Sequence, residues 1–385
     1  MIVTKLFNDF FHSEKSGGIF LIICTVISLI LTNSVLQPYY ASIWNYDLGG
    51  HSVTHWINDG LMAIFFLLIG LELEREIYIG ELSNFKNALL PIFAAVGGML
   101  FPAAIHLMIN YGSPFQAGAG IPMATDIAFA LGVLSLLGNR VPLSLKIFLT
   151  ALAVIDDLGA ILIIAIFYTG SIEWQNLLTS LGIFAFLLVL NRLKVKNLIP
   201  YLIAGIGMWY FMLHSGIHAT ITGVLLAFAI PFRDGSVKSP SYILQHFLHR
   251  PVAFIILPLF ALANTSIVIS SHWYQVLLTT NSMGIMGGLI LGKPLGIVIF
   301  SYLSIRFKLT TLPGDFNYKQ MIGVGFLGGI GFTMSIFISI LAFDDDALVQ
   351  QSKIAVMLAS LVTGLVGYLI LKWFSTQNSQ NIQAV

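Results

Sequence analysis

Apolar segments of bilayer length recur along almost the whole chain, from Gly17 to Phe374. An α-helix needs about 20 predominantly apolar residues to cross the hydrocarbon core of a membrane. Hydrophobic residues make up 57% of the chain and charged residues 9%, whereas soluble domains carry about 25% charged residues. The sequence therefore predicts an all-α polytopic membrane protein with about twelve spans. We expect them at residues 15–34, 56–78, 88–109, 116–138, 144–168, 173–191, 198–213, 216–231, 251–268, 282–304, 319–343 and 350–373.

The positive charges alternate with these spans. Of the 18 Lys and Arg residues, all but Lys293 and Lys353 lie near the two termini or in one alternating set of loops. Because cytoplasmic loops carry an excess of Lys and Arg, we expect these loops and both termini on the cytoplasmic side. The net charge of +1 gives no reason to expect a nucleic-acid partner.

Three segments lie outside the predicted spans of this single transmembrane domain. Residues 1–14 are amphipathic and predict a helix on the membrane surface. Residues 35–55 form a periplasmic loop in which Gly49 and Gly50 separate short β-prone stretches, which is typical of a hairpin. Residues 375–385 are polar and predict a disordered tail.

Four ionisable residues fall inside predicted spans: Asp126, Asp156, Asp157 and Lys293. Each costs about 2.5–3.5 kcal/mol at the centre of a membrane helix, so they must face the protein interior, a partner or water. A structural ion pair with Lys293 would account for one acid and leave two unexplained. An intramembrane site is therefore the better interpretation of the set.

Adjacent carboxylates in a membrane offer a chemistry that a single ion pair does not. Burial and a neighbouring like charge both disfavour the ionised form of a carboxyl group, so such groups bind protons more readily. An ionised carboxylate also supplies the oxygen ligand that a hard cation such as Na⁺ prefers. Proton and cation then compete for one site, which gives exchange if the site opens to one side at a time.

Two of the predicted spans are rich in helix-breaking residues near their centres. In the fourth span, Gly118, Gly120 and Pro122 stand directly before Thr125 and Asp126. The eleventh span contains a run of glycines: Gly323, Gly325, Gly328, Gly329 and Gly331. Interrupted helices in corresponding places of two halves are typical of a transporter binding site. We therefore expect both to be interrupted and to cross near the midplane, within an inverted repeat of spans three to five and ten to twelve.

A third group of glycines has a different interpretation. Gly288, Gly292 and Gly296 recur every four residues in the tenth span. Small residues at this spacing allow two membrane helices to approach closely.

At these residues the chain resembles the NhaA family of bacterial Na⁺/H⁺ antiporters. The matching segments include "GLELERE" at 70–76, "IPMATDIAFALGVLSLLG" at 121–138, "LKIFLTALAVIDDLGAILIIAIFY" at 145–168, "GLILGKPLGI" at 288–297 and "GGIGFTMSIFI" at 328–338. The resemblance implies a symmetric dimer in the bacterial inner membrane and electrogenic exchange of internal Na⁺ or Li⁺ for external protons. Its role would be sodium extrusion and pH regulation. It implies no cofactor and no catalytic residue.

The resemblance also assigns roles to particular residues. Asp157 corresponds to the principal ligand of the transported cation, Asp156 to its partner and Thr125 to a neighbour at the helix break. Asp126 and Lys293 correspond to residues that compensate the charges of the broken helix ends. Two assignments of the proton carriers stay open: Asp156 with Asp157, or Asp157 with Lys293.

The family further carries a pH-responsive cytoplasmic funnel. Glu72, Arg75 and Glu76 match its part on the second span, and His246 and His249 match its part on the ninth. An acidic residue often precedes the first of these histidines, whereas this chain departs from that pattern with Gln245. The alternative is that all five residues belong to solvated helix ends.

Three other functions are compatible with buried acids. An intramembrane aspartyl protease would use Asp126 and Asp157 as its acid pair, but its Gly-x-Gly-Asp and Pro-Ala-Leu patterns do not occur. A cation channel would conduct without proton coupling. An exchanger of organic anions is disfavoured by the acidic centre.

Overall fold

The structure is a computed structural model that describes residues 2–232, 235–269, 273–313 and 317–382. Side chains are described for these residues apart from 2–15, 139 and 376–382. Within these limits all regular structure is helical, and one isolated antiparallel bridge joins Asp47 to Ser52. The predicted all-α class is confirmed.

Seven described helices are long and apolar enough to cross a membrane, and two bent pairs raise the number to nine. The seven are Val53–Tyr78, Phe85–Asn110, Leu143–Phe167, Trp174–Arg192, Pro240–Asn264, Thr280–Arg306 and Asp346–Ser375. The remaining three predicted spans coincide with shorter apolar helices. The first is Ser16–Thr32, the second half of α1 (Ile2–Thr32). The other two are α9 (Ile199–Leu213) and α10 (Ile221–Ala229). Each predicted span therefore corresponds to a helix or to a bent pair.

The chain divides into two compact units. The first consists of Met1–Ile23, Asn84–Ala160 and Ile267–Val385, and the second of Cys24–Ser83 and Ile161–Ser266. Two of the four boundaries fall inside helices, one in α1 and one in α7 (Leu143–Phe167), and the other two follow Ser83 and Ser266. Each unit is described below by itself.

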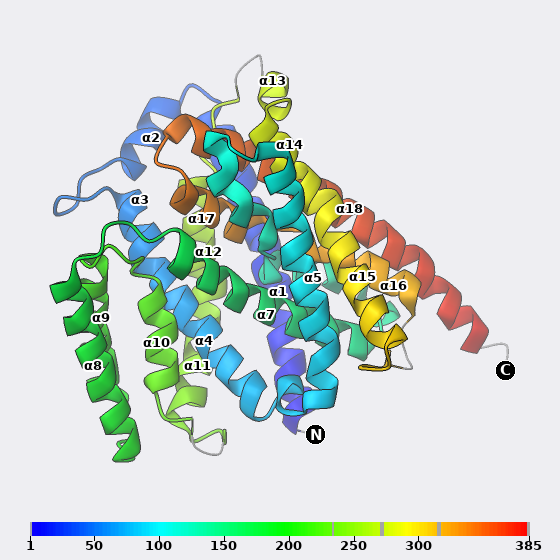
Figure 1. Ribbon diagram of the computed structural model, residues 1–385, viewed down its shortest axis with the longest axis horizontal. Coiled ribbons are helices and arrows are strands. Elements are labelled where there is room, and N and C mark those ends of the chain that lie inside the picture. Colours follow the sequence, from blue (N-terminus) through cyan, green and yellow to red (C-terminus); the bar gives the residue numbers. More distant parts are fainter. Residues whose placement is uncertain (1, 233–234, 270–272, 314–316, 383–385) are drawn as a thin grey trace. The chain divides into compact units, whose positions relative to one another are not determined.

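In the first unit, α5 (Phe85–Asn110) and α15 (Lys293–Arg306) run side by side (Figure 1). A π-helical turn, Gly288–Gly292, joins α15 to α14 (Thr280–Gly287). A Cβ on Gly292 would lie 2.8 Å from Cα of Pro102, and one on Gly296 would overlap the backbone of Gly97. Glycine at these positions lets the two helices approach closely, as the four-residue spacing predicted.

Both expected interruptions occur, and both lie in the first unit. In the fourth span, a 3₁₀ helix (Pro114–Met123) is bent by 42° against α6 (Ile127–Ser135). In the eleventh, α16 (Tyr318–Gly328) is bent by 44° against α17 (Phe332–Ala342). The backbone N–H of Asp126 donates to the carbonyl of Ile330 at 2.6 Å, so the two breaks meet. An interruption of this kind exposes backbone groups that another segment must satisfy.

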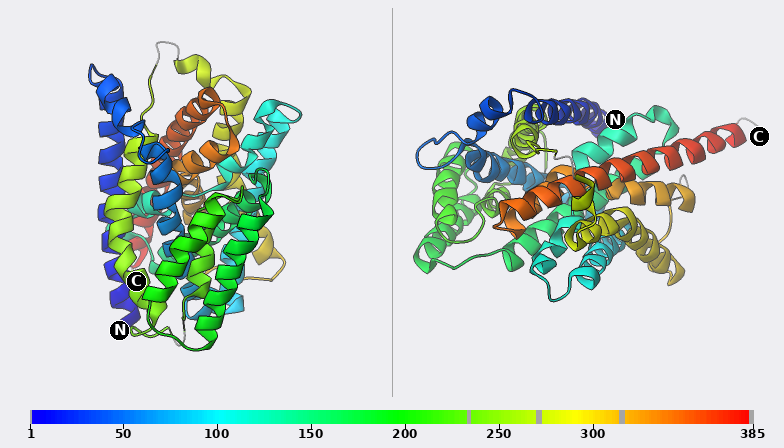
Figure 2. Two further views of the ribbon diagram at one scale, coloured as in Figure 1. Left: turned by 90° about the vertical axis from the view of Figure 1, so that its left-hand side faces the viewer. Right: turned by 90° about the horizontal axis from the view of Figure 1, so that it is seen from above.

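The second unit packs α4 (Met62–Tyr78) against α10, and α8 (Trp174–Arg192) against α9 (Figures 1 and 2). Glycine again allows close contact, because a Cβ on Gly223 of α10 would lie 2.7 Å from the backbone nitrogen of Leu67. The ninth span of the chain lies in this unit. It consists of α11 (Pro240–Pro251), the π-helical turn Val252–Ile256 and α12 (Leu257–Asn264).

Three segments outside the spans differ in detail from the expectations. Residues 2–14 do not form a separate helix, since α1 runs unbroken from Ile2 to Thr32. Residues 35–55 contain a short helix, α2 (Gln37–Trp44), and then a tight turn in which Gly49 and Gly50 both have positive φ. That turn is closed by the single Asp47–Ser52 bridge.

At the other end, α18 (Asp346–Ile382) continues through most of the segment expected to be disordered. Residues 376–382 contain neither glycine nor proline, the residues that most readily end a helix. Residues 383–385 of the expected tail lie outside the described residues.

Candidate functional site

The two adjacent acids lie on α7, in the first unit, and both are fully buried. This helix is apolar along most of its length, and its packing residues Leu152 and Ala153 are also fully buried. Successive residues of a helix point about 100° apart, so the neighbouring carboxylates face different directions. Asp156 and Asp157 therefore have different surroundings.

Asp156 is bound by two side chains from other spans. Its Oδ2 atom lies 2.9 Å from Nζ of Lys293 and 2.7 Å from the hydroxyl of Thr125. That hydroxyl is also 2.8 Å from the carbonyl of Gly328, and since it has one proton, it donates to one of the two oxygens at a time. The second oxygen of Asp156, Oδ1, has no hydrogen-bond partner among the described residues.

Asp157 stands beside this group on the same helix. Its carboxylate is fully buried and interacts electrostatically with Lys293. Two carboxylates thus share one lysine, so the buried site has an excess of negative charge when all three groups are ionised. A cation or a proton would relieve that excess.

Asp126 links the N-terminal ends of the second halves of both interrupted spans. Its Oδ1 accepts the backbone N–H of Phe129 at 2.9 Å, which caps α6. Its Oδ2 accepts both the backbone N–H and the hydroxyl of Thr333, in the first turn of α17. Helix N-termini carry partial positive charge, so a carboxylate stabilises both.

The first halves of both interrupted spans end in backbone carbonyls that lie near hydrogen-bond donors. The ammonium of Lys293 donates to the carbonyl of Met123, the last residue of the 3₁₀ helix. The hydroxyl of Thr125 is the group near the carbonyl of Gly328, the last residue of α16. The structure therefore brings the residues predicted for the cation site and the helix breaks into one cluster: Thr125, Asp126, Asp156, Asp157 and Lys293.

The residues expected to respond to pH lie in the second unit, on α4 and α11. His249 Nδ1 is 3.8 Å from Oε1 of Glu72, so these two approach each other. Glu76 instead accepts the backbone N–H of Glu81 at 3.0 Å. The guanidinium of Arg75 lies 5.7 Å from the ring centre of Tyr242.

His246 completes this group and is exposed. Its ring is parallel to that of Tyr242, with 6.1 Å between ring centres. His246 and Arg75 thus lie near the same tyrosine.

Thr333 and Glu74 are buried residues with polar contacts that were not predicted from the sequence. Thr333 opens the second half of an interrupted span, as Asp126 does in the other, but a threonine in an apolar run gives no signal of its own. Glu74 is buried on α4, and its Oε2 accepts the hydroxyl of Ser241 on α11 at 3.0 Å. Its place within a run of charges, "ELERE", made it indistinguishable from a solvated acid.

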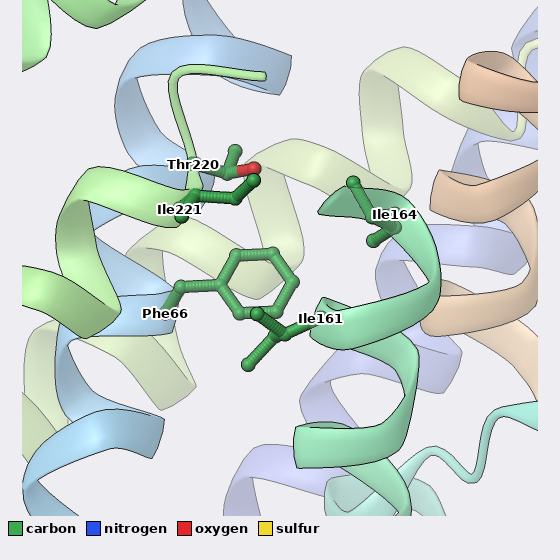
Figure 3. A pocket seen from close by; sticks show the side chains of 5 residues that line it. All are labelled: Phe66, Ile161, Ile164, Thr220 and Ile221. Carbon is green, nitrogen blue, oxygen red and sulfur yellow. The ribbon is translucent and has the colours of Figure 1, made fainter. Parts of the chain in front are cut away.

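The second unit also contains a small apolar pocket. Phe66, Ile161, Ile164, Thr220 and Ile221 line it, and Figure 3 shows these side chains converging. No space within it admits a water molecule. It is therefore a packing defect rather than an ion site.

Apolar helices of membrane length, two crossed interruptions and buried acids beside them define a secondary transporter of the membrane. Comparison with known proteins identifies the family. The sequence profile of the family described as "Na⁺/H⁺ antiporter 1" matches residues 8–371. The chain belongs to this family.

Relatives match over nearly their whole length. A protein of Flavobacterium psychrophilum named Na(+)/H(+) antiporter NhaA is 64% identical, over 97% of either chain. Proteins with the same name in Cytophaga hutchinsonii and Dechloromonas aromatica are 61% and 58% identical. The match to the Cytophaga protein covers 97% of this chain and 96% of that protein. The match to the Dechloromonas protein covers 98% of each chain. Membership in a family of transporters argues against the protease considered from the sequence.

Proposed function

We propose that the protein exchanges Na⁺ or Li⁺ for protons at the carboxylates of Asp157 and Asp156. The observation that carries this proposal is the position of the two buried acids beside the crossed helix breaks, with one lysine that pairs with Asp156 and interacts electrostatically with Asp157. Family membership supports the same exchange.

The exchange follows from competition. When the site is open to the cytoplasm, Na⁺ binds carboxylate oxygens of Asp157 and Asp156, and the protons leave. When it opens to the outside, protons bind and Na⁺ is released. Thr125 adds an oxygen ligand while its hydroxyl donates to the carbonyl of Gly328. A neutral site and a cation-loaded site both avoid the cost of unpaired buried charge.

Charge balance bears on the stoichiometry. If one Na⁺ displaces protons from two groups, more positive charge enters than leaves, and the exchange is electrogenic. The pair of groups is Asp156 with Asp157, or Asp157 with Lys293. In the second case the lysine loses its proton as Asp156 turns from it to the cation.

Several wider features belong to the same proposal. The protein acts in the bacterial inner membrane with both termini in the cytoplasm, extrudes sodium and regulates internal pH. It works as a homodimer to which the turn at residues 47–52 contributes. Glu72, Arg75, Glu76, His246 and His249 adjust its activity to cytoplasmic pH.

The test uses purified protein in vesicles that hold a proton gradient. Addition of Na⁺ or Li⁺ should dissipate the gradient, whereas choline should not. Asp157→Asn should abolish the response, while Asp344→Asn, in the exposed segment after α17, should not. Substantial Na⁺-driven exchange by a folded Asp157→Asn protein would end the proposal.

Electrogenicity has its own readout in the same vesicles. A potassium diffusion potential that is negative inside should accelerate proton entry coupled to Na⁺ exit. An equal rate at zero potential would show that the exchange is electroneutral and would exclude a second proton carrier.

A further inference from the structure

Two polar side chains of the first unit are fully buried but take no part in the proposed exchange. His106 and Asn110 lie one turn apart on α5, and neither exposes more than 1% of its surface. A buried polar side chain is costly unless its hydrogen bonds are made. The partners of these two residues therefore indicate what they do.

His106 binds the start of the interrupted fourth span. Its Nε2 atom lies 3.0 Å from the carbonyl of Phe115, in the first turn of the 3₁₀ helix. A carbonyl only accepts, so Nε2 carries a proton, and in a neutral imidazole Nδ1 then carries none. Among the described residues Nδ1 makes no hydrogen bond. The ring is thus a one-sided donor directed at the 3₁₀ helix.

Glycines of two different spans make room for this ring. A Cβ on Gly284 of α14 would lie 2.6 Å from His106 Nδ1, and a Cβ on Gly118 of the 3₁₀ helix would lie 3.2 Å from Nε2. The imidazole therefore fills the space between the fourth and tenth spans, where any larger residue at Gly284 would collide with it.

Asn110 extends the same connection. Its amide nitrogen donates to the carbonyl of His106 and to that of Thr280, the first residue of α14, at 3.1 Å each. The third, fourth and tenth spans are in this way joined by two neighbouring side chains.

The 3₁₀ helix needs such anchors at both ends. It has ten residues, whereas 3₁₀ runs longer than about four are uncommon because their hydrogen bonds are poorly aligned. Its far end is fixed by Lys293 at the carbonyl of Met123 and by Ser335 at the carbonyl of Ile121, the latter at 2.6 Å. Its near end is fixed by His106.

We propose that His106 is a positioning residue for cation exchange, which holds the 3₁₀ helix so that its far end meets Lys293 and places Thr125 beside Asp156. This inference rests on the proposed function. His106 touches neither of the two acids, so its effect reaches the cation through the backbone of the 3₁₀ helix. Its loss should therefore change the apparent affinity for Na⁺ more than the maximal rate.

The first test compares two substitutions in vesicles. His106→Gln retains an N–H near the position of Nε2, whereas His106→Leu has none. We expect the leucine variant to raise KM for Na⁺ about fivefold, the factor that corresponds to one lost hydrogen bond, and the glutamine variant to stay within about twofold of the wild type. A leucine variant that loses thermal stability but keeps the wild-type KM would overturn the proposal.

If His106→Leu does not fold, two glycine substitutions on the neighbouring span provide a second test. A methyl group at Gly284 would lie 2.6 Å from His106 Nδ1 and 2.5 Å from Asn110 Nδ2, so Gly284→Ala disturbs both side chains of this connection, whereas a Cβ on Gly287 meets only Ile105 at an ordinary 3.4 Å. We expect Gly284→Ala to raise KM and Gly287→Ala to leave it unchanged; equal KM values for the two would refute the positioning role of His106 and the Asn110 contact that extends it. Wild-type vesicles that show no exchange would instead contradict the proposed function.

Discussion

The ammonium group of Lys293 lies 2.9 Å from a carboxylate oxygen of Asp156 and also donates to the carbonyl of Met123. One side chain therefore serves an acid of the fifth span and the broken end of the fourth. All three groups belong to the first unit. This lysine therefore links the site to the helix interruption directly.

Replacement of Lys293 by methionine should make stability depend on pH. The substitution keeps most of the packing volume but leaves Asp156 without its cation, and removal of one partner from a buried ion pair costs about 3–5 kcal/mol. A neutral Asp156 needs no positive counter-charge, so the loss should be largest at high pH and should shrink as the pH falls and the carboxyl group binds a proton.

Thermal unfolding in detergent across a pH series measures this effect. Lys238→Met, in an exposed loop, is the matched control and should show no such dependence. The double variant Asp156→Asn with Lys293→Met should be less destabilised than the sum of the single variants, because it leaves neither charge of the pair buried alone. Additive effects would contradict the pairing.

Thr125 provides a prediction about affinity. Thr125→Val preserves shape but removes the hydroxyl that lies 2.7 Å from Asp156, whereas Thr125→Ser keeps it. A buried hydrogen bond contributes about 1 kcal/mol, so the valine variant should bind Na⁺ about fivefold more weakly and the serine variant nearly normally.

The KM for Na⁺ in vesicles is the measurement for Thr125. Thr179→Val is the control, since Thr179 is exposed and its hydroxyl donates within α8 to the carbonyl of Gln175. If the serine and valine variants behave alike, the hydroxyl has no part in cation binding.

Asp126 should be needed for stability, because one carboxylate accepts from both helix ends. In Asp126→Asn one oxygen becomes an amide group that donates, and it then faces N–H groups that also donate. Hydrogen bonds to a charged group contribute about 1.5–3 kcal/mol, so we expect a loss of about that size. Thermal unfolding of Asp126→Asn beside Asp47→Asn, whose carboxylate accepts from Gly50 in an exposed turn, tests it.

The class of fold and the cluster of acids could be predicted from the sequence because a membrane makes both conspicuous. Repeated apolar runs of bilayer length are typical of membrane spans, and a charged residue within one requires a reason. The positions of the two helix breaks were also predictable, because glycine and proline mark them directly. Charged residues within spans, together with the marked helix breaks, indicate that Asp126 and Lys293 belong to one cluster.

Contacts between distant polar residues were not predictable in the same way. Thr333 lies 207 residues from the carboxylate that it binds. Nothing in the chain distinguishes its hydroxyl from those of Ser335 or Ser339 before the two breaks are brought together. His106 and Glu74 were missed for the same reason: their roles depend on glycine gaps and hydroxyls contributed by other spans.

Glycines of the second unit give a last prediction, one that separates close packing from helix propensity. A methyl group on Gly223 would lie 2.7 Å from the backbone nitrogen of Leu67, and backbone does not move aside as a flexible side chain does. Gly182 of α8 is exposed, and a methyl group there would meet no atom within 4 Å. Alanine favours a helix over glycine by about 1 kcal/mol in either place.

The two alanine variants should therefore move stability in opposite directions. Gly182→Ala should be neutral or raise the thermal midpoint slightly, since it meets no neighbour. Gly223→Ala should lower it, because overpacking costs about 1–3 kcal/mol and exceeds the gain in propensity. If Gly223→Ala were as stable as Gly182→Ala, the prediction would be wrong. The close approach of α4 and α10 would then not contribute to the free energy of unfolding.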